Sequence, residues 1–178
     1  SCCVSRSFGI KVENFQMLAE SITSYSLNAA EKIRSDSLLA KSITIFIRTS
    51  PFQNKKIFYS NSKTIDFPIA TNNSIEIVKT ALIGLKLIFK NGYEYQKSGI
   101  VLSELSDSEK NVNLFGSLLK KNKIQKLMKS IDYTNYKYGR STLSLAEAGL
   151  NKKWNLRRQY SSKIDTADFV RLPIIKIT

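Results

Sequence analysis

The sequence contains no histidine, and its two cysteines are the adjacent Cys2 and Cys3. One pair of neighbouring thiols without histidine offers too few ligands for a structural zinc site. Adjacent cysteines rarely form a disulfide with each other, because the Cβ vectors of neighbouring residues point apart. We therefore predict two unpaired thiols at strand positions and a reducing, cytoplasmic setting.

The chain also lacks a long apolar run. No window approaches eighteen consecutive apolar residues, so the sequence predicts no membrane-spanning helix. The first residues, SCCVSRSFG, have neither the apolar core of a signal peptide nor a starting methionine. We interpret the chain as a piece of a longer protein or as a processed product. Its 178 residues are enough for one domain with a small appendage.

Acidic residues are scarce: 14 Asp and Glu stand against 28 Lys and Arg, a net charge of +14. Such an excess predicts an anionic partner, either a nucleic acid or an acidic membrane face. Residues 1–109 carry 13 basic and 10 acidic residues, whereas residues 110–163 carry 13 and only 2. We therefore predict a domain at 1–106, a linker at 107–116 and a basic segment at 117–178.

Clustered carboxylates, which two-metal nucleotidyl transfer needs in order to hold Mg²⁺, are missing from the sequence. The closest pair, Asp165 and Asp168, lies in a polar tail. There is no phosphate-binding lysine loop, no Ser/His/Asp set and no cysteine with a neighbouring base. The sequence therefore predicts a chain without catalytic residues, metal or cofactor.

Apolar periodicity predicts six elements in the order strand, helix, strand, strand, helix, strand. They cover residues 2–8, 15–33, 41–49, 59–67, 73–89 and 93–105. Gly9 and Pro68 are expected to end the first and third strands, and Asn73 to cap the second helix. The order βαββαβ is the ferredoxin-like arrangement, an α+β fold with a four-stranded antiparallel sheet and two helices on one face.

Two helices cannot cover both faces of such a sheet, so the other face must tolerate water or a ligand. On the strand 41–49, three isoleucines alternate with Ser42, Thr44, Phe46 and Arg48. Hydroxyls and a cation on the uncovered side suit a phosphate backbone. Beyond residue 107, a helix at about 117–131 is expected, followed by short segments with few apolar residues.

Several stretches, taken in order, resemble the C-terminal half of the UmuC-type Y-family translesion DNA polymerases. They are VSRSFG at 4–9, SITIFIRTSPF at 42–52, YSNS at 59–62, GYEYQKSGIVLSEL at 92–105 and GRSTLSLAEAGLNKKWNLRRQYSSKIDT at 139–166. The resemblance implies a little-finger domain that lies along primer-template DNA, followed by the C-terminal segment of this family. It also implies a role in SOS mutagenesis and a UmuD-like subunit as a further partner.

The resemblance implies contacts that go mainly to phosphates, which position a protein without reading sequence. On the first strand the candidates are Ser5, Arg6 and Ser7, of which Arg6 is favoured most. Weaker candidates on the other strands are Thr44, Arg48, Ser60, Ser62 and Lys97.

The segment NVNLF at 111–115 resembles the peptide with which these polymerases dock in the apolar pocket of the sliding clamp. Leu114 and Phe115 would be the anchors, while Asn111 and Val112 replace the usual Gln and Leu. Because Asn is one methylene shorter than Gln, the resemblance implies weaker docking or its loss.

Trp154 lies among basic residues, where it could stack on an unpaired base or cover a small core; we favour the core. Three alternatives to a DNA-binding fragment remain. They are a free-standing RNA-binding module, a membrane-surface protein held by the basic segment, and a gene remnant without function. The strands lack the aromatic motif of an RNA-recognition domain, and the helix at 117–131 only partly fits a membrane helix.

Overall fold

The computed structural model describes residues 1–52, 58–107 and 118–156. Its elements follow the predicted order. They are β1 (Cys2–Val12), α1 (Phe15–Ser35), β2 (Leu38–Thr49), β3 (Ser60–Thr71), α2 (Ser74–Ile88), β4 (Tyr95–Asp107), α3 (Leu118–Tyr138) and a short 3-10 turn (Ala146–Ala148). The α+β class and the βαββαβ order are confirmed.

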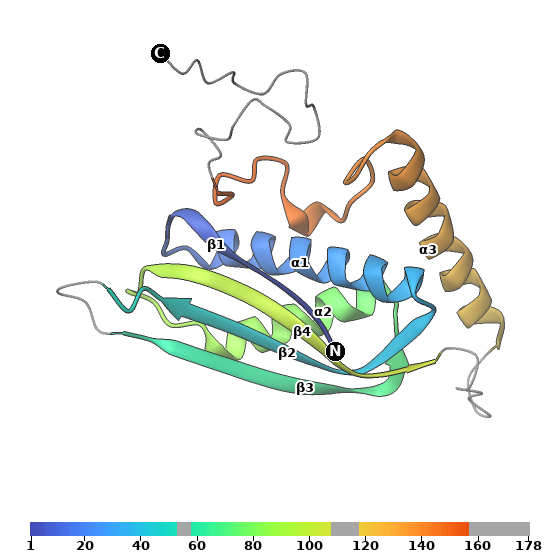
Figure 1. Ribbon diagram of the computed structural model, residues 1–178, viewed down its shortest axis with the longest axis horizontal. Helices are drawn as coiled ribbons and strands as arrows, with labels where there is room; N and C mark the ends of the chain where they lie inside the picture. Colours follow the sequence, from blue (N-terminus) through green and yellow to red (C-terminus); the bar gives the residue numbers. More distant parts are fainter. Residues whose placement is uncertain (53–57, 108–117, 157–178) are drawn as a thin grey trace, which may run out of the picture.

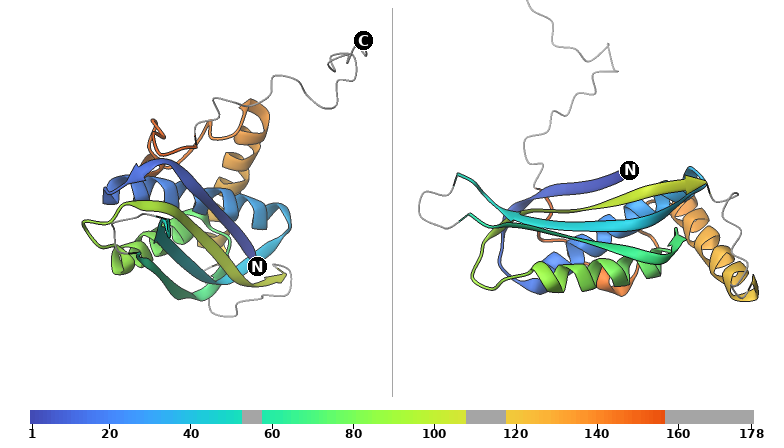
Figure 2. Two further views of the ribbon diagram at one scale, coloured as in Figure 1. Left: turned by 60° about the vertical axis from the view of Figure 1, so that its left-hand side comes forward. Right: turned by 90° about the horizontal axis from the view of Figure 1, so that it is seen from below.

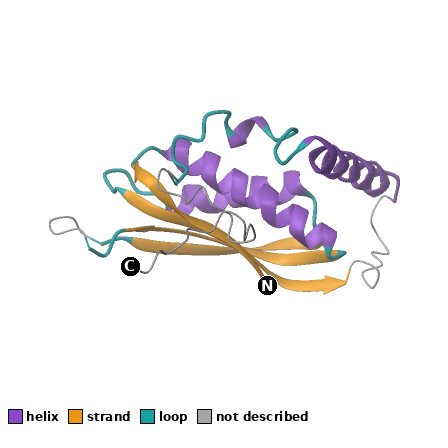
Figure 3. Cartoon of the chain, turned by 45° about the horizontal axis from the view of Figure 1, so that its top comes forward, coloured by secondary structure: helices purple, strands orange, loops and turns teal. Residues whose placement is uncertain are grey.

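The four strands form one antiparallel sheet in the order β1-β4-β2-β3. Strand β4 therefore separates β1 from β2, and β2 separates β4 from β3, so each βαβ unit is split by a strand of the other. Helices α1 and α2 lie side by side on one face (Figures 1 and 2). No described helix covers the other face, as Figure 3 shows.

Both packed helices begin at an asparagine that caps them. The side chain of Asn14 accepts a hydrogen bond from the Gln16 amide at 2.7 Å, and that of Asn73 accepts one from the Ile75 amide at 3.1 Å. These bonds satisfy amides that have no partner inside the helix. The predicted cap of the second helix is thus confirmed. From these starts, the apolar stripes of both helices pack onto Ile43, Ile45 and Ile47 of β2, which are fully buried.

Two predicted strand ends are wrong. Strand β3 continues through Pro68 to Thr71, because the pairing with β2 shifts between Ala40, which faces Thr71, and Ser42, which faces Asp66. Proline is tolerated there because β3 is an edge strand and the shift removes the need for a ladder hydrogen bond. Strand β1 likewise continues past Gly9, whose amide donates to the Trp154 carbonyl at 3.1 Å.

Residues 139–156 return along α1 and place Trp154 in the core. The indole is 2% exposed and meets the rings of Phe8 and Tyr25 edge-on, with centroids 6.2 and 5.7 Å away. The interpretation of Trp154 as a core residue is confirmed. Burial raises the pKa of Tyr25 to about 12, so this phenol stays neutral at physiological pH.

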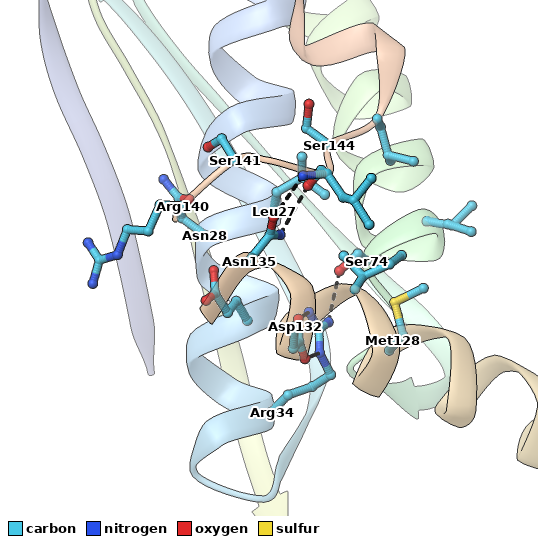
Figure 4. Close-up of a pocket in the computed structure, with 15 residues that line it drawn as sticks. Leu27, Asn28, Arg34, Ser74, Met128, Asp132, Asn135, Arg140, Ser141 and Ser144 are labelled. Atoms are coloured by element: carbon cyan, nitrogen blue, oxygen red, sulfur yellow. Dashed lines mark hydrogen bonds and ion pairs between the residues drawn. The ribbon is translucent and has the colours of Figure 1, made fainter. Parts of the chain in front are cut away.

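Helix α3 is attached to α1 by one polar cluster (Figure 4). The guanidinium of Arg34 donates from Nε and Nη2 to the two carboxylate oxygens of Asp132, each at 2.7 Å. Its Nη1 donates to the Asn72 carbonyl at 2.7 Å and to Ser74 Oγ at 2.8 Å. Because Arg34 is half-buried and makes four bonds, it fixes α3 against the α1–α2 pair.

Candidate nucleic-acid interface

Strand register brings most of the predicted DNA-binding residues onto the face that the helices leave uncovered. Residues directly opposite each other on neighbouring strands share a face. We call this surface the open face; its central rows run Cys3–Val101–Thr44–Thr64, Ser5–Gly99–Phe46–Ser62 and Ser7–Lys97–Arg48–Ser60. Seven of the eight predicted residues lie in these rows.

The open face carries serine and threonine hydroxyls along its rows, and two cations lie in the row at one end, which we call the cationic end. Arg48 and Lys97 are direct cross-strand neighbours, flanked by Ser7 and Ser60. Arg48 is exposed, and the three rows contain no carboxylate. Farther along the sheet the charge reverses, since Asp66 pairs with Ser42, whose hydroxyl lies 3.4 Å from a Glu104 carboxylate oxygen. The cationic end is therefore the part suited to phosphate.

An aromatic ring occupies the middle of the open face. Phe46 is opposite Gly99, and a Cβ built on that glycine would lie 2.6 Å from Phe46 Cζ and would overlap the Cβ of Ser5. Gly99 thus leaves the space in which the half-buried ring lies across β4 toward β1. Sequence reasoning missed this role, although a glycine inside a strand is itself a signal of close approach.

Arg6 does not join the other candidates. It is opposite Ser98, which is fully buried and whose hydroxyl is 3.0 Å from that of Ser21 on α1. By register, Arg6 therefore belongs to the helix side of β1, where it is exposed at the edge of the sheet. Three consecutive strand residues cannot share one face, so Ser5, Arg6 and Ser7 were never able to act as one surface.

The four candidate clamp-binding residues lie outside the described residues. They are Asn111, Val112, Leu114 and Phe115. Their role stays a prediction.

The described part of the chain offers no metal site and no membrane-spanning helix. It contains no group of three or more His, Cys, Asp or Glu side chains that could bind a metal. None of the described helices is both long and apolar enough to cross a membrane. A hollow of about 210 Å³ lies between α1, α3 and residues 140–145 (Figure 4), but the Arg34 that lines it is already bound by Asp132 and Ser74. The hollow therefore lies at the contact through which α3 packs against the rest of the domain.

Two family models match the chain. One, described as the impB/mucB/samB family C-terminal domain, matches residues 1–114. The chain belongs to the impB/mucB/samB family. The other, described as a domain of unknown function, matches residues 125–175. The first match covers β1 to β4 and therefore the whole open face.

Known members of the impB/mucB/samB family are similar along nearly the whole chain. Protein UmuC of Salmonella typhimurium is 32% identical over 173 residues, which are 97% of this chain and 41% of that protein. Protein MucB of Escherichia coli is 33% identical over 174 residues, with 98% and 41% covered. The chain therefore spans about two fifths of the length of these relatives. The resemblance to the C-terminal part of UmuC-type proteins is confirmed.

Among solved structures, the chain is similar to one titled a complex of the β-clamp processivity factor and the little finger domain of PolIV. The TM-score is 0.42 and the identity 13%, over 65% of this chain and 97% of that one.

Proposed function

We propose that this chain is a DNA-binding portion of an error-prone translesion polymerase of the UmuC type, and that its open face holds the phosphate backbone of duplex DNA. The observation that carries the proposal is the register, which brings the hydroxyl rows and the Arg48–Lys97 pair onto one uncovered surface. Membership of the impB/mucB/samB family supports it. Nucleotide transfer would then belong to residues outside this chain.

Phosphate binding at this surface has a simple physical basis. Each Lys or Arg that neutralises a phosphate releases condensed counterions, which makes affinity fall with salt. The serine and threonine hydroxyls beside the two cations can donate to phosphate oxygens. Such contacts carry no sequence information, so the proposal predicts binding that tolerates any template sequence.

Replacing the two cations tests the open face. We expect Arg48→Gln/Lys97→Gln to weaken binding to a hairpin DNA duplex by roughly tenfold or more, because two charge-assisted contacts are lost. The slope of log K against log salt should become shallower by about 1.8, that is about 0.9 for each lost phosphate contact. Fluorescence anisotropy over a range of salt concentrations measures both quantities.

The matched control is Lys79→Gln/Lys86→Gln. It removes the same charge from two exposed positions of α2, on the covered side of the sheet. Equal losses in both variants would show only a general charge effect and would contradict the open face as the binding site. Binding of single-stranded RNA that is tighter than duplex binding and that is lost in the Arg48 and Lys97 variant would favour the RNA-binding alternative instead.

We further propose that residues 111–115 dock on the sliding clamp, with Leu114 and Phe115 as apolar anchors. Two adjacent large apolar residues after a polar stretch need a partner, and the family resemblance supplies the clamp pocket. In a pull-down with purified clamp, Leu114→Ala/Phe115→Ala should lower the retained fraction at least about tenfold, since two buried anchors are lost. Asn113→Ala in the same peptide is the control, and an unchanged yield in the double variant would contradict this proposal.

A UmuD-like subunit is a further proposed partner.

A further inference from the structure

Helix α3 has two faces of opposite character. At 100° per residue, the face toward the body is formed by Ile124, Met128, Ile131, Asp132 and Asn135. Met128 on this face is 3% exposed, and Asp132 holds Arg34. The outward face consists of Lys123, Lys126, Lys129, Tyr133, Tyr136 and Lys137, all of them exposed. We call these six residues the α3 basic face.

Among the residues that the structure describes, no carboxylate pairs with the lysines of the α3 basic face. The only acidic residue of α3 is Asp132, and both of its oxygens are taken by Arg34 on the inward side. From Lys123 to Lys137 the charges extend over about 21 Å of helix, at 1.5 Å per residue. A surface of this kind attracts an extended polyanion.

Two tyrosines lie between these lysines. Tyr133 is 63% exposed and Tyr136 is 89% exposed, although the helix also has a buried side that could have received an aromatic ring. Tyr133 is four residues from Lys129 and four from Lys137, so it lies next to both on the helix surface. Aromatic rings between cations stack on unpaired bases while the cations hold the backbone. Bases in a duplex are already stacked and do not offer this contact.

We propose that the α3 basic face binds single-stranded nucleic acid. This site goes beyond the proposed function, because α3 lies past one end of the sheet and on its helix side, away from the open face (Figures 1 and 2). One chain can therefore hold a duplex and an unpaired strand on different surfaces. The lysines bind the phosphate backbone, and unpaired bases stack on the two tyrosine rings.

A membrane surface fits this helix less well. Binding of a helix in the interface plane requires a broad apolar face opposite the lysines, which enters the acyl region. On α3 the side opposite the lysines carries the buried Met128 and the ion-paired Asp132. It is therefore occupied by α1 and is not free to enter a lipid layer.

The test compares two DNA probes on the full chain: a fluorescein-labelled oligothymidylate and a hairpin duplex. We expect Tyr133→Ser/Tyr136→Ser to weaken oligothymidylate binding at least about fivefold, the lower end for one lost base stack, and to change duplex affinity less than about twofold. Lys126→Gln/Lys129→Gln should make the salt slope on oligothymidylate shallower by about 1.4, at about 0.7 per phosphate on single strands. Since these side chains are exposed, thermal unfolding should match the unchanged chain.

Lys79→Gln/Lys86→Gln on α2 is again the control and should leave oligothymidylate binding unchanged. The proposal is overturned if the tyrosine variant keeps its oligothymidylate affinity, or if it loses affinity for both probes equally. It is also overturned if α3 variants lose binding to phosphatidylserine vesicles while oligothymidylate binding stays intact, which would favour the membrane. Loss of duplex binding in the Arg48 and Lys97 variant alone leaves this proposal standing, so the two sites can fail independently.

Discussion

Replacing Trp154 with alanine should lower the free energy of unfolding by about 3–4 kcal/mol, the usual cost of removing a large aromatic ring from a core. The indole is 2% exposed and fills the space between Phe8 and Tyr25, so its loss leaves a cavity that the rigid sheet and α1 cannot close. Urea unfolding followed by tyrosine fluorescence or circular dichroism gives the value. The single tryptophan of the chain provides a direct probe of the same transition in the unchanged protein.

Leu156→Ala is the matched control for this substitution. Leu156 lies two residues on but is 59% exposed, so we expect a change within about 0.5 kcal/mol. Equal stability of the Trp154→Ala variant and the unchanged chain would mean that residues 139–156 do not contact β1 and α1 in solution. The expected loss of stability would instead show that two regions pack together although separate family models match them. Trp154 lies in the region that one model matches, and Phe8 and Tyr25 lie in the region that the other matches.

The part of the fold that sequence predicted well is the part set by short-range periodicity. Alternation on β2 identified the buried isoleucines and the uncovered side with Thr44 and Arg48, because successive strand residues point to opposite faces. The same rule explains the placement of Arg6. The resemblance nominated three consecutive residues of β1, and alternation turns the middle one toward the helix side.

Contacts between distant residues could not be read in the same way. Arg34 and Asp132 are 98 positions apart, and no periodic pattern relates the end of α1 to the middle of α3. The ring partners of Trp154 depend on how residues 139–156 return along α1. The ends of the strands could not be predicted from the sequence either. Pro68 is compatible with β3 only because β3 is an edge strand and its pairing with β2 shifts beside this residue.

The uneven charge of the chain gains a physical interpretation from the structure. The rows of the open face carry two cations, whereas α3 alone carries six lysines against one aspartate. A single phosphate-binding sheet therefore does not account for where most of the positive charge lies. Two anionic segments, one on the open face and one on the α3 basic face, would engage cations from both halves of the chain.

Gly99→Ala should destabilise the chain by about 2 kcal/mol and weaken duplex binding at the same time. The added methyl would overlap Ser5 Cβ and lie 2.6 Å from Phe46 Cζ, so both the ring and the β1–β4 spacing must shift. Overpacking of this kind typically costs about 1–3 kcal/mol. Gln96→Ala on the same strand is the control, because Gln96 is exposed and we expect a change within about 0.5 kcal/mol.

A second variant separates crowding from a general effect of alanine on the strand. Ser5→Gly/Gly99→Ala removes the Ser5 Cβ, which the new methyl meets first, and leaves the Phe46 ring as the remaining contact. We expect it to regain roughly half of the lost stability, since a side chain can rotate where a strand cannot. If the double variant were less stable than Gly99→Ala by the full cost of a strand glycine, about 1 kcal/mol, crowding would not be the cause. Recovered stability together with weak duplex binding would instead show that duplex binding depends on the open face around Ser5 and Phe46, and not only on the integrity of the sheet.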